Sequence, residues 1–211
     1  MSTVRRVLLP AVVMAWFAAP GSAQSVPLFD GHSLSGWQRM AVHGGRGGVW
    51  QVADGVLVAD QDSDHTGGLL GTTHRYGDYD LALEFMGNAP FDSGIFLRTR
   101  PDGMGYQITL DDREDGYVGS LYDPLHGFLQ RFPDWRRAYR RGEWNVLRVR
   151  IAGQPPRIEA WLNGVRTVAF EDSLSRYPAQ GVIGLQVHGG RGAWGDSSRA
   201  RFRNIRITEL P

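Results

Sequence analysis

Apolar and polar residues alternate with a period of two along several stretches of this chain, as they do in strands that bury one face. In 80–85, every second residue is a leucine or phenylalanine, and Glu84 lies among the polar positions between them. The stretches 93–98, 106–111 and 182–188 alternate in the same way. We therefore expect half-buried strands with one side facing a core.

The polar sides of these four stretches carry acids, amides, an arginine and a histidine. An ordinary solvated face favours Lys, Glu, Thr and Ser, whereas these side chains offer hydrogen-bonding and acid–base groups that suit a polyhydroxylated ligand. If the four strands share a sheet, their polar side chains line one surface. The side chains expected on it are Glu84, Arg98, Gln107, Thr109, Asp111, Gln186 and His188.

Short β-type segments recur along the rest of the chain, with turn signals between them. Asn163-Gly164 between two such segments is the clearest hairpin, because this dipeptide suits a tight two-residue turn. The segment 123–141 is less regular and reads as a long loop, with or without one short helix. Many strands and few helices predict an all-β sandwich or jelly roll. The expected strands are 49–52, 56–59, 79–85, 94–98, 106–110, 146–151, 158–162, 165–170, 182–187 and 201–207.

The first residues have the pattern of a signal peptide. Arg5 and Arg6 precede the apolar run 7–19, and a small-residue cleavage signal ends at Ala23. The run is shorter than the roughly 20 apolar residues of a membrane-spanning helix. We expect residues 1–23 to be removed from a secreted or periplasmic protein. The remaining residues, 24–211, would form a single domain without a membrane span.

The composition excludes several classes of function. All 23 basic residues are arginine, and the chain contains no cysteine. These absences exclude Schiff-base lysine chemistry, a Walker P-loop, thiol nucleophiles and cysteine metal sites. Losing two arginines with the signal peptide leaves 21 basic and 22 acidic residues. Since no basic stripe emerges, we expect no nucleic-acid partner.

Two further motifs have plain interpretations. His43 and His188 each begin a His-Gly-Gly-Arg-Gly sequence, and neither has the strand–loop–helix setting of a phosphate-binding loop. We interpret the first copy as a flexible glycine loop and favour His188, which directly follows a polar-sided strand. The acidic run of Asp60, Asp62 and Asp64 departs from a calcium loop at its sixth and twelfth positions, so we expect a solvated turn.

Other chemistry stays open at this point. Glu84, Arg98 and Asp111 could form an ion-pair lattice on an exposed sheet face. Glu84 and Asp111 also allow a two-carboxylate glycosidase, whose spacing the sequence does not fix. A serine triad has no support, because no Gly-x-Ser-x-Gly elbow occurs. Most tryptophans in a sandwich belong to its core, although four could stack on sugar faces: Trp37, Trp144, Trp161 and Trp194.

Eight short motifs occur in order along the chain, and each is weak by itself. Among them are Leu28-Phe29-Asp30-Gly31, Ser93-Gly94-Ile95-Phe96-Leu97-Arg98 and Gly184-Leu185-Gln186-Val187-His188-Gly189. Together the series resembles the 3-keto-disaccharide hydrolase family over residues 26–210. The full set of matching segments is 28–37, 50–57, 76–85, 93–98, 142–145, 161–164, 184–189 and 202–207.

The resemblance implies a concanavalin A-like β-sandwich, in which two curved antiparallel sheets hold the ligand on a concave face. It also implies an exported enzyme that acts on 3-keto-glycosides. In the chemistry it implies, a ketone at C3 acidifies the C2 proton, a base removes that proton, and the C1 oxygen leaves. Water then adds, so the net reaction is hydrolysis of an oxidised sugar or glycoside. Some members of the family look metal-dependent, which makes a divalent metal ion the candidate cofactor.

On this resemblance we assign the reacting roles to three side chains. His188 or Glu84 would be the base, and Arg98 would stabilise the enolate. The sugar hydroxyls would be held by Gln107, Gln186 and Asp111, and the leaving oxygen would receive its proton from Tyr122.

The chain departs from the family pattern in the expected strand 106–110. Its Tyr-Glu-(apolar)-Gln pattern reads here as Tyr106-Gln107-Ile108-Thr109, so an amide replaces a carboxylate. Asp111, further along the same face, is positioned to compensate. The alternative to an enzyme is a non-catalytic carbohydrate-binding module of the same fold.

Overall fold

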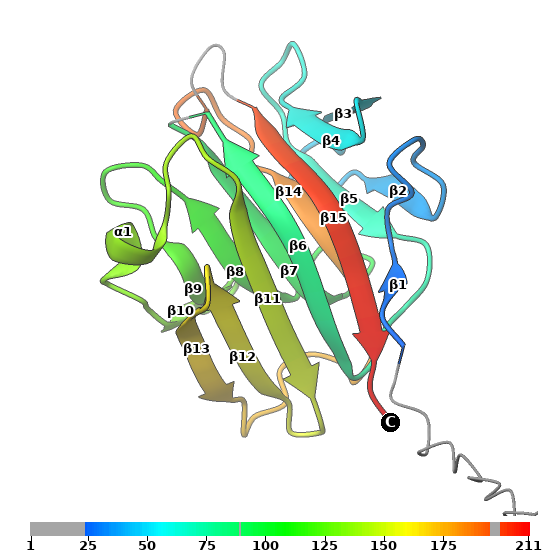
Figure 1. Ribbon diagram of the computed structural model, residues 1–211, viewed down its shortest axis with the longest axis vertical. Helices are drawn as coiled ribbons and strands as arrows, with labels where there is room; N and C mark the ends of the chain where they lie inside the picture. The colour runs from blue at the N-terminus through cyan, green and yellow to red at the C-terminus, as the bar shows by residue number, and fades with distance from the viewer. Residues whose placement is uncertain (1–23, 89, 195–198) are drawn as a thin grey trace, which may run out of the picture.

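The computed structural model describes residues 24–88, 90–194 and 199–211, which form two stacked antiparallel sheets (Figure 1). The expected signal peptide, 1–23, lies outside the described residues. The described part contains one short helix, α1 (Trp135–Ala138), and none with the length and hydropathy needed to cross a bilayer. The all-β sandwich expected from the alternation is confirmed.

The sheet at the front of Figure 1, here called sheet A, has eight strands in the order β13-β12-β11-β6-β15-β4-β3, with β1 paired to β15. Their bounds are β1 (Val26–Pro27), β3 (Val49–Ala53), β4 (Val56–Asp60), β6 (Tyr79–Gly87), β11 (Asn145–Ala152), β12 (Arg157–Leu162), β13 (Val165–Glu171) and β15 (Ala200–Glu209).

The second sheet, sheet B, lies behind sheet A and has seven strands in the order β10-β9-β8-β7-β14-β5-β2. Their bounds are β2 (Trp37–Met40), β5 (Gly68–Thr72), β7 (Asp92–Thr99), β8 (Tyr106–Asp111), β9 (Val118–Asp123), β10 (Gly127–Gln130) and β14 (Val182–Val187).

The core lies between the sheets and follows from the alternation. Phe85 and Phe202 from sheet A and Ile95 and Ile108 from sheet B are almost completely inaccessible to solvent. Burying each such side chain contributes about 1.5–3 kcal/mol. Because the apolar residues point inward, the polar residues between them point to the outer face of their own sheet. Each sheet therefore presents a separate polar surface.

The turn chemistry of the sequence is confirmed at the predicted hairpin. Asn163 and Gly164 join β12 to β13, and both have positive φ angles, 49° and 84°, as a type I′ turn requires. All ten expected strands are present. The segment 123–141, expected as a loop with or without a helix, holds both the strand β10 and the helix α1. The sequence analysis missed the short strands β1, β2, β5, β9 and β10.

An irregularity near the end of β7 changes which way one side chain points. Opposite β7, the pairing of β14 shifts register between Val182 and Gly184. Arg98 lies in this stretch with a φ of 47°, in the left-handed region that a side chain rarely adopts. Bulges of this kind re-aim a side chain, and Arg98 is completely buried instead of lying outward beyond Phe96.

Candidate functional site

The outer face of sheet B carries two adjoining hollows. The first hollow has a volume of about 450 Å³ and the second about 280 Å³. Gln107 on β8, Tyr122 on β9 and His188 directly after β14 line both of them. A ligand placed over these three side chains can therefore extend into either hollow.

The strand register brings residues distant in sequence onto this face. Asp92 on β7 pairs with Asp111 on β8, and Phe96 pairs with Gln107. Gln107 pairs in turn with Tyr122 on the next strand. Directly opposite residues on antiparallel strands share a face, so acids gather at one end of these strands and amides and rings at the other.

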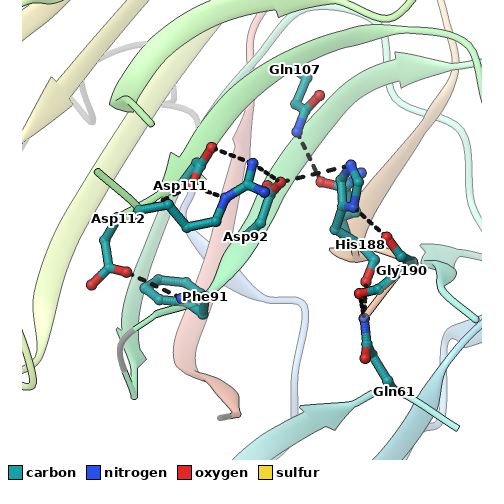
Figure 2. Close-up of polar contacts among 11 residues, drawn as sticks. Gln61, Phe91, Asp92, Gln107, Asp111, Asp112, His188 and Gly190 are labelled. Atoms are coloured by element: carbon teal, nitrogen blue, oxygen red, sulfur yellow. Dashed lines mark hydrogen bonds and ion pairs between the residues drawn. The ribbon is translucent and has the colours of Figure 1, made fainter. Parts of the chain in front are cut away.

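A pair of amides bridges the middle of the site. The Gln107 Nε2 donates a hydrogen bond of 2.8 Å to Gln186 Oε1 on β14 (Figure 2). Gly94 lies beneath Gln107, and a Cβ there would come within 2.2 Å of Gln107 Nε2. Glycine therefore makes room for the bridge. The NH₂ group of Gln186 and the amide oxygen of Gln107 make no hydrogen bond to another described residue, which leaves them available to ligand hydroxyls.

The hydrogen bond on one ring nitrogen fixes the tautomer of neutral His188. Its Nδ1 lies 2.8 Å from the carbonyl oxygen of Gly189, and a carbonyl can only accept, so Nδ1 carries the hydrogen. The lone pair then resides on Nε2, which lies 3.7 Å from Asp92 Oδ2 (Figure 2). The His188 side chain is 45% exposed. Its Nε2 is thus a proton acceptor that a ligand in either hollow can reach.

Asp92 is the buried acid of the site. The pKa of Asp92 is raised to about 6, chiefly by burial and also by the nearby Asp111, while His188 and Arg113 act in the opposite direction. The carboxylate still accepts a hydrogen bond of 2.7 Å from Arg113 Nη2. Asp92 therefore places a buried carboxyl group 3.7 Å from the Nε2 of His188.

Arg113, in the loop after β8, joins two of the acids. It donates from Nε and Nη2 to the two oxygens of Asp111, each at 2.8 Å, and from Nη2 to Asp92. The hydrogen bond to Asp111 raises the pKa of Arg113 above its ordinary value, despite partial burial. Such a bidentate pair fixes the guanidinium firmly. Among the described residues that line either hollow, Arg113 is the only arginine.

The floor of the first hollow is built from main chain. A Cβ at Gly45 would lie 2.0 Å from the carbonyl oxygen of Gly67, and a Cβ at Gly67 would lie 2.1 Å from that of Val187. The two His-Gly-Gly-Arg-Gly segments therefore pack on either side of Gly67, too closely for any side chain. Our interpretation of the first copy as a flexible loop is wrong, since His43 and Gly45 form part of the wall.

Gln61 anchors the loop that carries the histidine. Its Nε2 donates to the carbonyl oxygens of His188, at 2.7 Å, and Gly190, at 2.9 Å (Figure 2). Its Oε1 lies 3.2 Å from His65 Nδ1, which must donate because the amide oxygen accepts. The side chain thereby ties the loop after β4 to the loop after β14.

Glu84 does not belong to this site. It lies on β6 in sheet A, whereas β7, β8 and β14 belong to sheet B, so the assumption that all four strands share one sheet is wrong. Its carboxylate accepts hydrogen bonds of 2.7 Å from Arg203 Nε and Asn204 Nδ2 on the outer face of sheet A. The two-carboxylate arrangement with Asp111 fails for the same reason.

Arg98 does not belong to the site either, because the bulge turns it away from Phe96. Its guanidinium is buried and donates to Asp78 Oδ1 at 2.7 Å, and to the carbonyl oxygens of Gly77 and Gly153, each at 3.1 Å. These contacts join β7 of sheet B to the loops at the end of sheet A. Arg98 therefore lines neither hollow, and its placement on the ligand-binding surface is wrong.

The structure brings together the other side chains that the sequence predicted for the site. These are Gln107, Asp111, Tyr122, Gln186 and His188. Asp92 was not predicted, although extending the alternation of 93–98 by one residue would have included it on the side of Gly94. Arg113, Tyr117 and Phe128 were not predicted either, because the first two lie in a loop and Phe128 lies in the four-residue strand β10, which are too short or irregular to show a period.

The remaining candidates have structural roles or lie elsewhere. Trp37 and Trp194 are buried, while Trp144 and Trp161 pack beneath arginines of sheet A. Asp62 accepts hydrogen bonds from the backbone of Asp64 and Thr66, which closes the expected acidic turn. No tryptophan is among the described residues that line the two hollows.

The residues present do not fit the divalent metal ion that the resemblance suggested. Within 24–88, 90–194 and 199–211, no three histidine, aspartate or glutamate side chains gather closely enough to hold one. Asp92 and Asp111 are bridged by the guanidinium of Arg113, which occupies the carboxylate oxygens that a cation would use. The chemistry considered below therefore uses only the side chains of the chain.

Comparison with known proteins agrees with a carbohydrate-related domain. The family model of the 3-keto-α-glucoside-1,2-lyase-like domain matches residues 24–208, in agreement with the resemblance of the motifs. Comparison with curated proteins finds no match.

Several solved structures share the fold. A "putative glycosyl hydrolase" from Parabacteroides distasonis is 23% identical, with 89% of this chain and 94% of that chain covered and a TM-score of 0.63. Carbohydrate-binding module CBM66 from Bacillus subtilis is 15% identical, with 82% and 96% covered and a TM-score of 0.59. The seed lectin of Lotus tetragonolobus is 11% identical, with 83% and 94% covered and a TM-score of 0.57. These likenesses establish a lectin-like, concanavalin A-like sandwich.

Proposed function

Because the chain belongs to the 3-keto-α-glucoside-1,2-lyase-like domain family, we propose that it cleaves 3-keto-glycosides at the two hollows of sheet B. The family and the glycosyl hydrolase-like neighbour support action on a carbohydrate. The oxidised substrate, the elimination mechanism and export are parts of the proposal. Export is supported by the signal-peptide pattern of residues 1–23.

In the proposed reaction, a ketone at C3 makes the C2 hydrogen of the sugar acidic. A base takes this proton, and the electron pair forms an enolate on the C3 oxygen. The enolate then expels the C1 substituent, whose oxygen leaves with the C1–O electron pair and receives a proton. Addition of water across the resulting C1–C2 double bond puts a hydroxyl on C1 and a hydrogen back on C2, so the net change is hydrolysis.

The observation that carries the proposal is the position of His188 at the border of the two hollows. Its Nε2 is the unprotonated nitrogen of the neutral ring and lies open to ligand on the side of Asp92. A general base works best when its pKa lies near the operating pH, which suits an imidazole. We assign C2 proton abstraction to His188. Asp92 is the neighbouring acid that exchanges protons with His188.

Three other side chains complete the proposed chemistry. Arg113 supplies the positive charge for the enolate in place of Arg98, since a positioned cation stabilises charge that develops in the transition state. The amide pair of Gln107 and Gln186 binds sugar hydroxyls through its unused donors and acceptors. Tyr122, which lines both hollows, is placed to protonate the leaving oxygen.

The test is to incubate the protein with a 3-keto-glucoside and with the same glucoside before oxidation, in D₂O and in H₂O. We expect cleavage of the oxidised substrate and incorporation of deuterium at C2, both detected by nuclear magnetic resonance. The unoxidised glucoside should not react, because its C2 hydrogen is not acidic. Efficient hydrolysis of the unoxidised glucoside, or cleavage without any C2 exchange, would contradict the mechanism.

A second candidate function is carbohydrate binding without cleavage. It is favoured by the amide at Gln107, where the family pattern has a carboxylate, and by the hydrogen bond that holds this amide to Gln186. A binding module would retain the 3-keto-glucoside unchanged. Saturable binding of that sugar with no product after prolonged incubation would support this second function over the first.

A further inference from the structure

The second hollow has an aromatic wall of three rings, whereas Phe96 and Tyr122 are the phenyl rings that line the first. Tyr117, Tyr122 and Phe128 line the second, and all three are partly exposed. The ring of Phe128 lies 5.0 Å from that of Tyr117 and 5.1 Å from that of Tyr122, with interplanar angles of 64° and 73°. The rings thus meet edge to face around Phe128, so their planes are inclined to one another and form no flat platform.

This wall is held in place without a ligand. The guanidinium carbon of Arg131 lies 4.6 Å from the centroid of the Phe128 ring and 5.8 Å from that of Tyr117. Arg131 itself is not among the residues that line the hollow. A cation over the ring restrains Phe128 from outside, and a wall that is already ordered loses less freedom when a ligand binds.

The opposite wall carries a negative charge. Asp92, Asp111 and Asp115 line it together with Thr109, and Arg113 is the only basic group among the lining residues that the structure describes. Three carboxylates against one guanidinium repel anionic groups. The same carboxylates accept hydrogen bonds from neutral hydroxyl groups.

We propose that the second hollow receives the leaving group of the substrate and selects a neutral phenolic ring, an inference that rests on the proposed function. His188, Gln107 and Tyr122 lie on the border of the hollows, so a sugar bound across this border, within reach of Arg113, directs its C1 oxygen into the second. The phenolic oxygen leaves with the C1–O electron pair and takes up one proton to become a phenol. A second hydroxyl on that ring donates to the carboxylate wall.

Two features favour an aromatic leaving group over a second sugar. A flat ring packs against inclined rings by edge-to-face contact, whereas sugar sites present a ring face for stacking. Phe128, which contacts both tyrosines, offers no hydrogen-bonding group, whereas a second sugar has hydroxyl groups around its whole edge. The choice between these leaving groups is an outcome of the tests below.

Binding tests the subsite separately from catalysis. The probe is hydroquinone, compared with cyclohexane-1,4-diol, which carries the same two hydroxyls without an aromatic ring. Titration of the full chain by calorimetry or nuclear magnetic resonance should show hydroquinone binding about tenfold tighter than the diol. Equal affinities, or no binding of hydroquinone, would overturn the proposal.

Variants locate the binding. Phe128→Leu should weaken hydroquinone binding about tenfold, and the milder Phe128→Tyr should retain it. Trp161→Leu is the matched control, because Trp161 is also a partly exposed ring beneath an arginine, Arg148 at 4.9 Å, but lies on sheet A. Circular dichroism checks that each variant is folded. Equal weakening in Trp161→Leu and Phe128→Leu would overturn the assignment to this hollow.

Turnover separates this inference from the proposed function. The ratio of kcat/KM for a 3-keto-glucoside of hydroquinone over that for a 3-keto-disaccharide should exceed one and should fall about tenfold in Phe128→Leu. An unchanged ratio, with both substrates cleaved, would overturn the phenolic subsite and leave the proposed function standing. If neither substrate is cleaved but hydroquinone binds through Phe128, the proposed function fails and the subsite is retained.

Discussion

The outer faces of the two sheets carry the same kinds of residue and differ in depth. On sheet A, Arg148 lies 2.9 Å from Asp80 and Arg203 lies 2.7 Å from Glu84, with the two acids 17% and 23% exposed. On sheet B, Asp92 is only 9% exposed and receives its arginine from a loop. Period-two alternation identifies the side that points outward, and it does not distinguish a flat face from a hollowed one.

This difference in depth decides what the charges do. Exposed ion pairs on sheet A gain little free energy, about 0–1 kcal/mol each, because water screens them. The buried acid on sheet B loses hydration, and the pKa of Asp92 rises to about 6 in response. A lattice of arginines and acids therefore serves solubility on one face, while similar groups on the other face become a candidate acid–base site.

The largest expected effect is on turnover, which should depend on His188 of sheet B and not on Glu84 of sheet A. His188→Gln should lower kcat/KM for a 3-keto-glucoside by about 10²–10⁴, because it removes the general base and leaves a half-exposed polar side chain. Glu84→Gln on sheet A should leave kcat/KM within about twofold. The measurement is the initial rate of each variant, after both have been shown to be folded. A severe loss in Glu84→Gln would restore that residue to the mechanism.

The next largest effect should be on the free energy of unfolding, when an arginine is removed from each sheet. Arg98→Ala should lower the free energy of unfolding by about 3–5 kcal/mol, because it removes a fully buried guanidinium that pairs with the partly exposed Asp78 and donates two hydrogen bonds to carbonyls. Arg203→Ala, which breaks an exposed pair, should cost less than about 1 kcal/mol. Denaturant titration gives both values. Equal costs would mean that the burial of Arg98 is not what stabilises the fold.

A smaller effect should appear in the pH dependence of stability. Burial raises the pKa of Asp92 from its ordinary 3.8 to about 6, so the folded state binds the proton more tightly than the unfolded state. The stability from this group is fully present below about pH 4 and is lost as pH rises through about 6. Asp92→Asn should not show this loss. The difference in unfolding free energy, variant minus wild type, should therefore increase by about 1–3 kcal/mol from pH 4 to pH 7.

The control for this pH experiment is Asp80→Asn on sheet A, measured by denaturant titration at the same two pH values. Asp80 pairs with exposed arginines on the outer face. Its substitution should not produce the same rise between pH 4 and pH 7. A similar rise in both variants would show that the burial of Asp92 is not its cause.

The smallest effect tests the support of the histidine loop. Gln61→Ala should lower kcat about tenfold and leave KM nearly unchanged, because the carbonyl oxygens of His188 and Gly190 lose their shared donor. Gln51→Ala, an exposed glutamine on β3, is the matched control. Rescue of the rate by Gln61→Asn is not expected, since the shorter side chain does not span the two carbonyls. A change in KM alone would point to a direct role in binding.

The fold was predictable from the sequence because strands and tight turns are local. Alternation placed ten strands, and the dipeptide Asn163-Gly164 located a hairpin whose two positive φ angles this pair favours. The missed strands β1, β2 and β10 are short edge strands of two to four residues, too brief to show a period. β5 contains two glycines in its five residues, which hides its alternation.

The site was predictable only in part, because it depends on which strands pair. Gln107, Gln186 and His188 were placed correctly, since their strands share a sheet. Glu84 was misplaced because the alternation of a strand does not say to which sheet it belongs. Arg98 was misplaced because a bulge in its own strand, β7, re-aimed it, and pairing with the distant strand β14 decides where that bulge occurs.

The packing of Gly45 and Gly67 beneath the first hollow divides the site into a part that can change and a part that cannot. No other side chain fits at these two positions, so the contour of that floor stays the same whatever residues surround it. The second hollow is walled by Tyr117, Tyr122 and Phe128, whose replacement leaves the backbone where it is. In a lineage of related enzymes, recognition of the sugar would therefore be inherited almost unaltered, while the group attached to that sugar could be exchanged by a few substitutions.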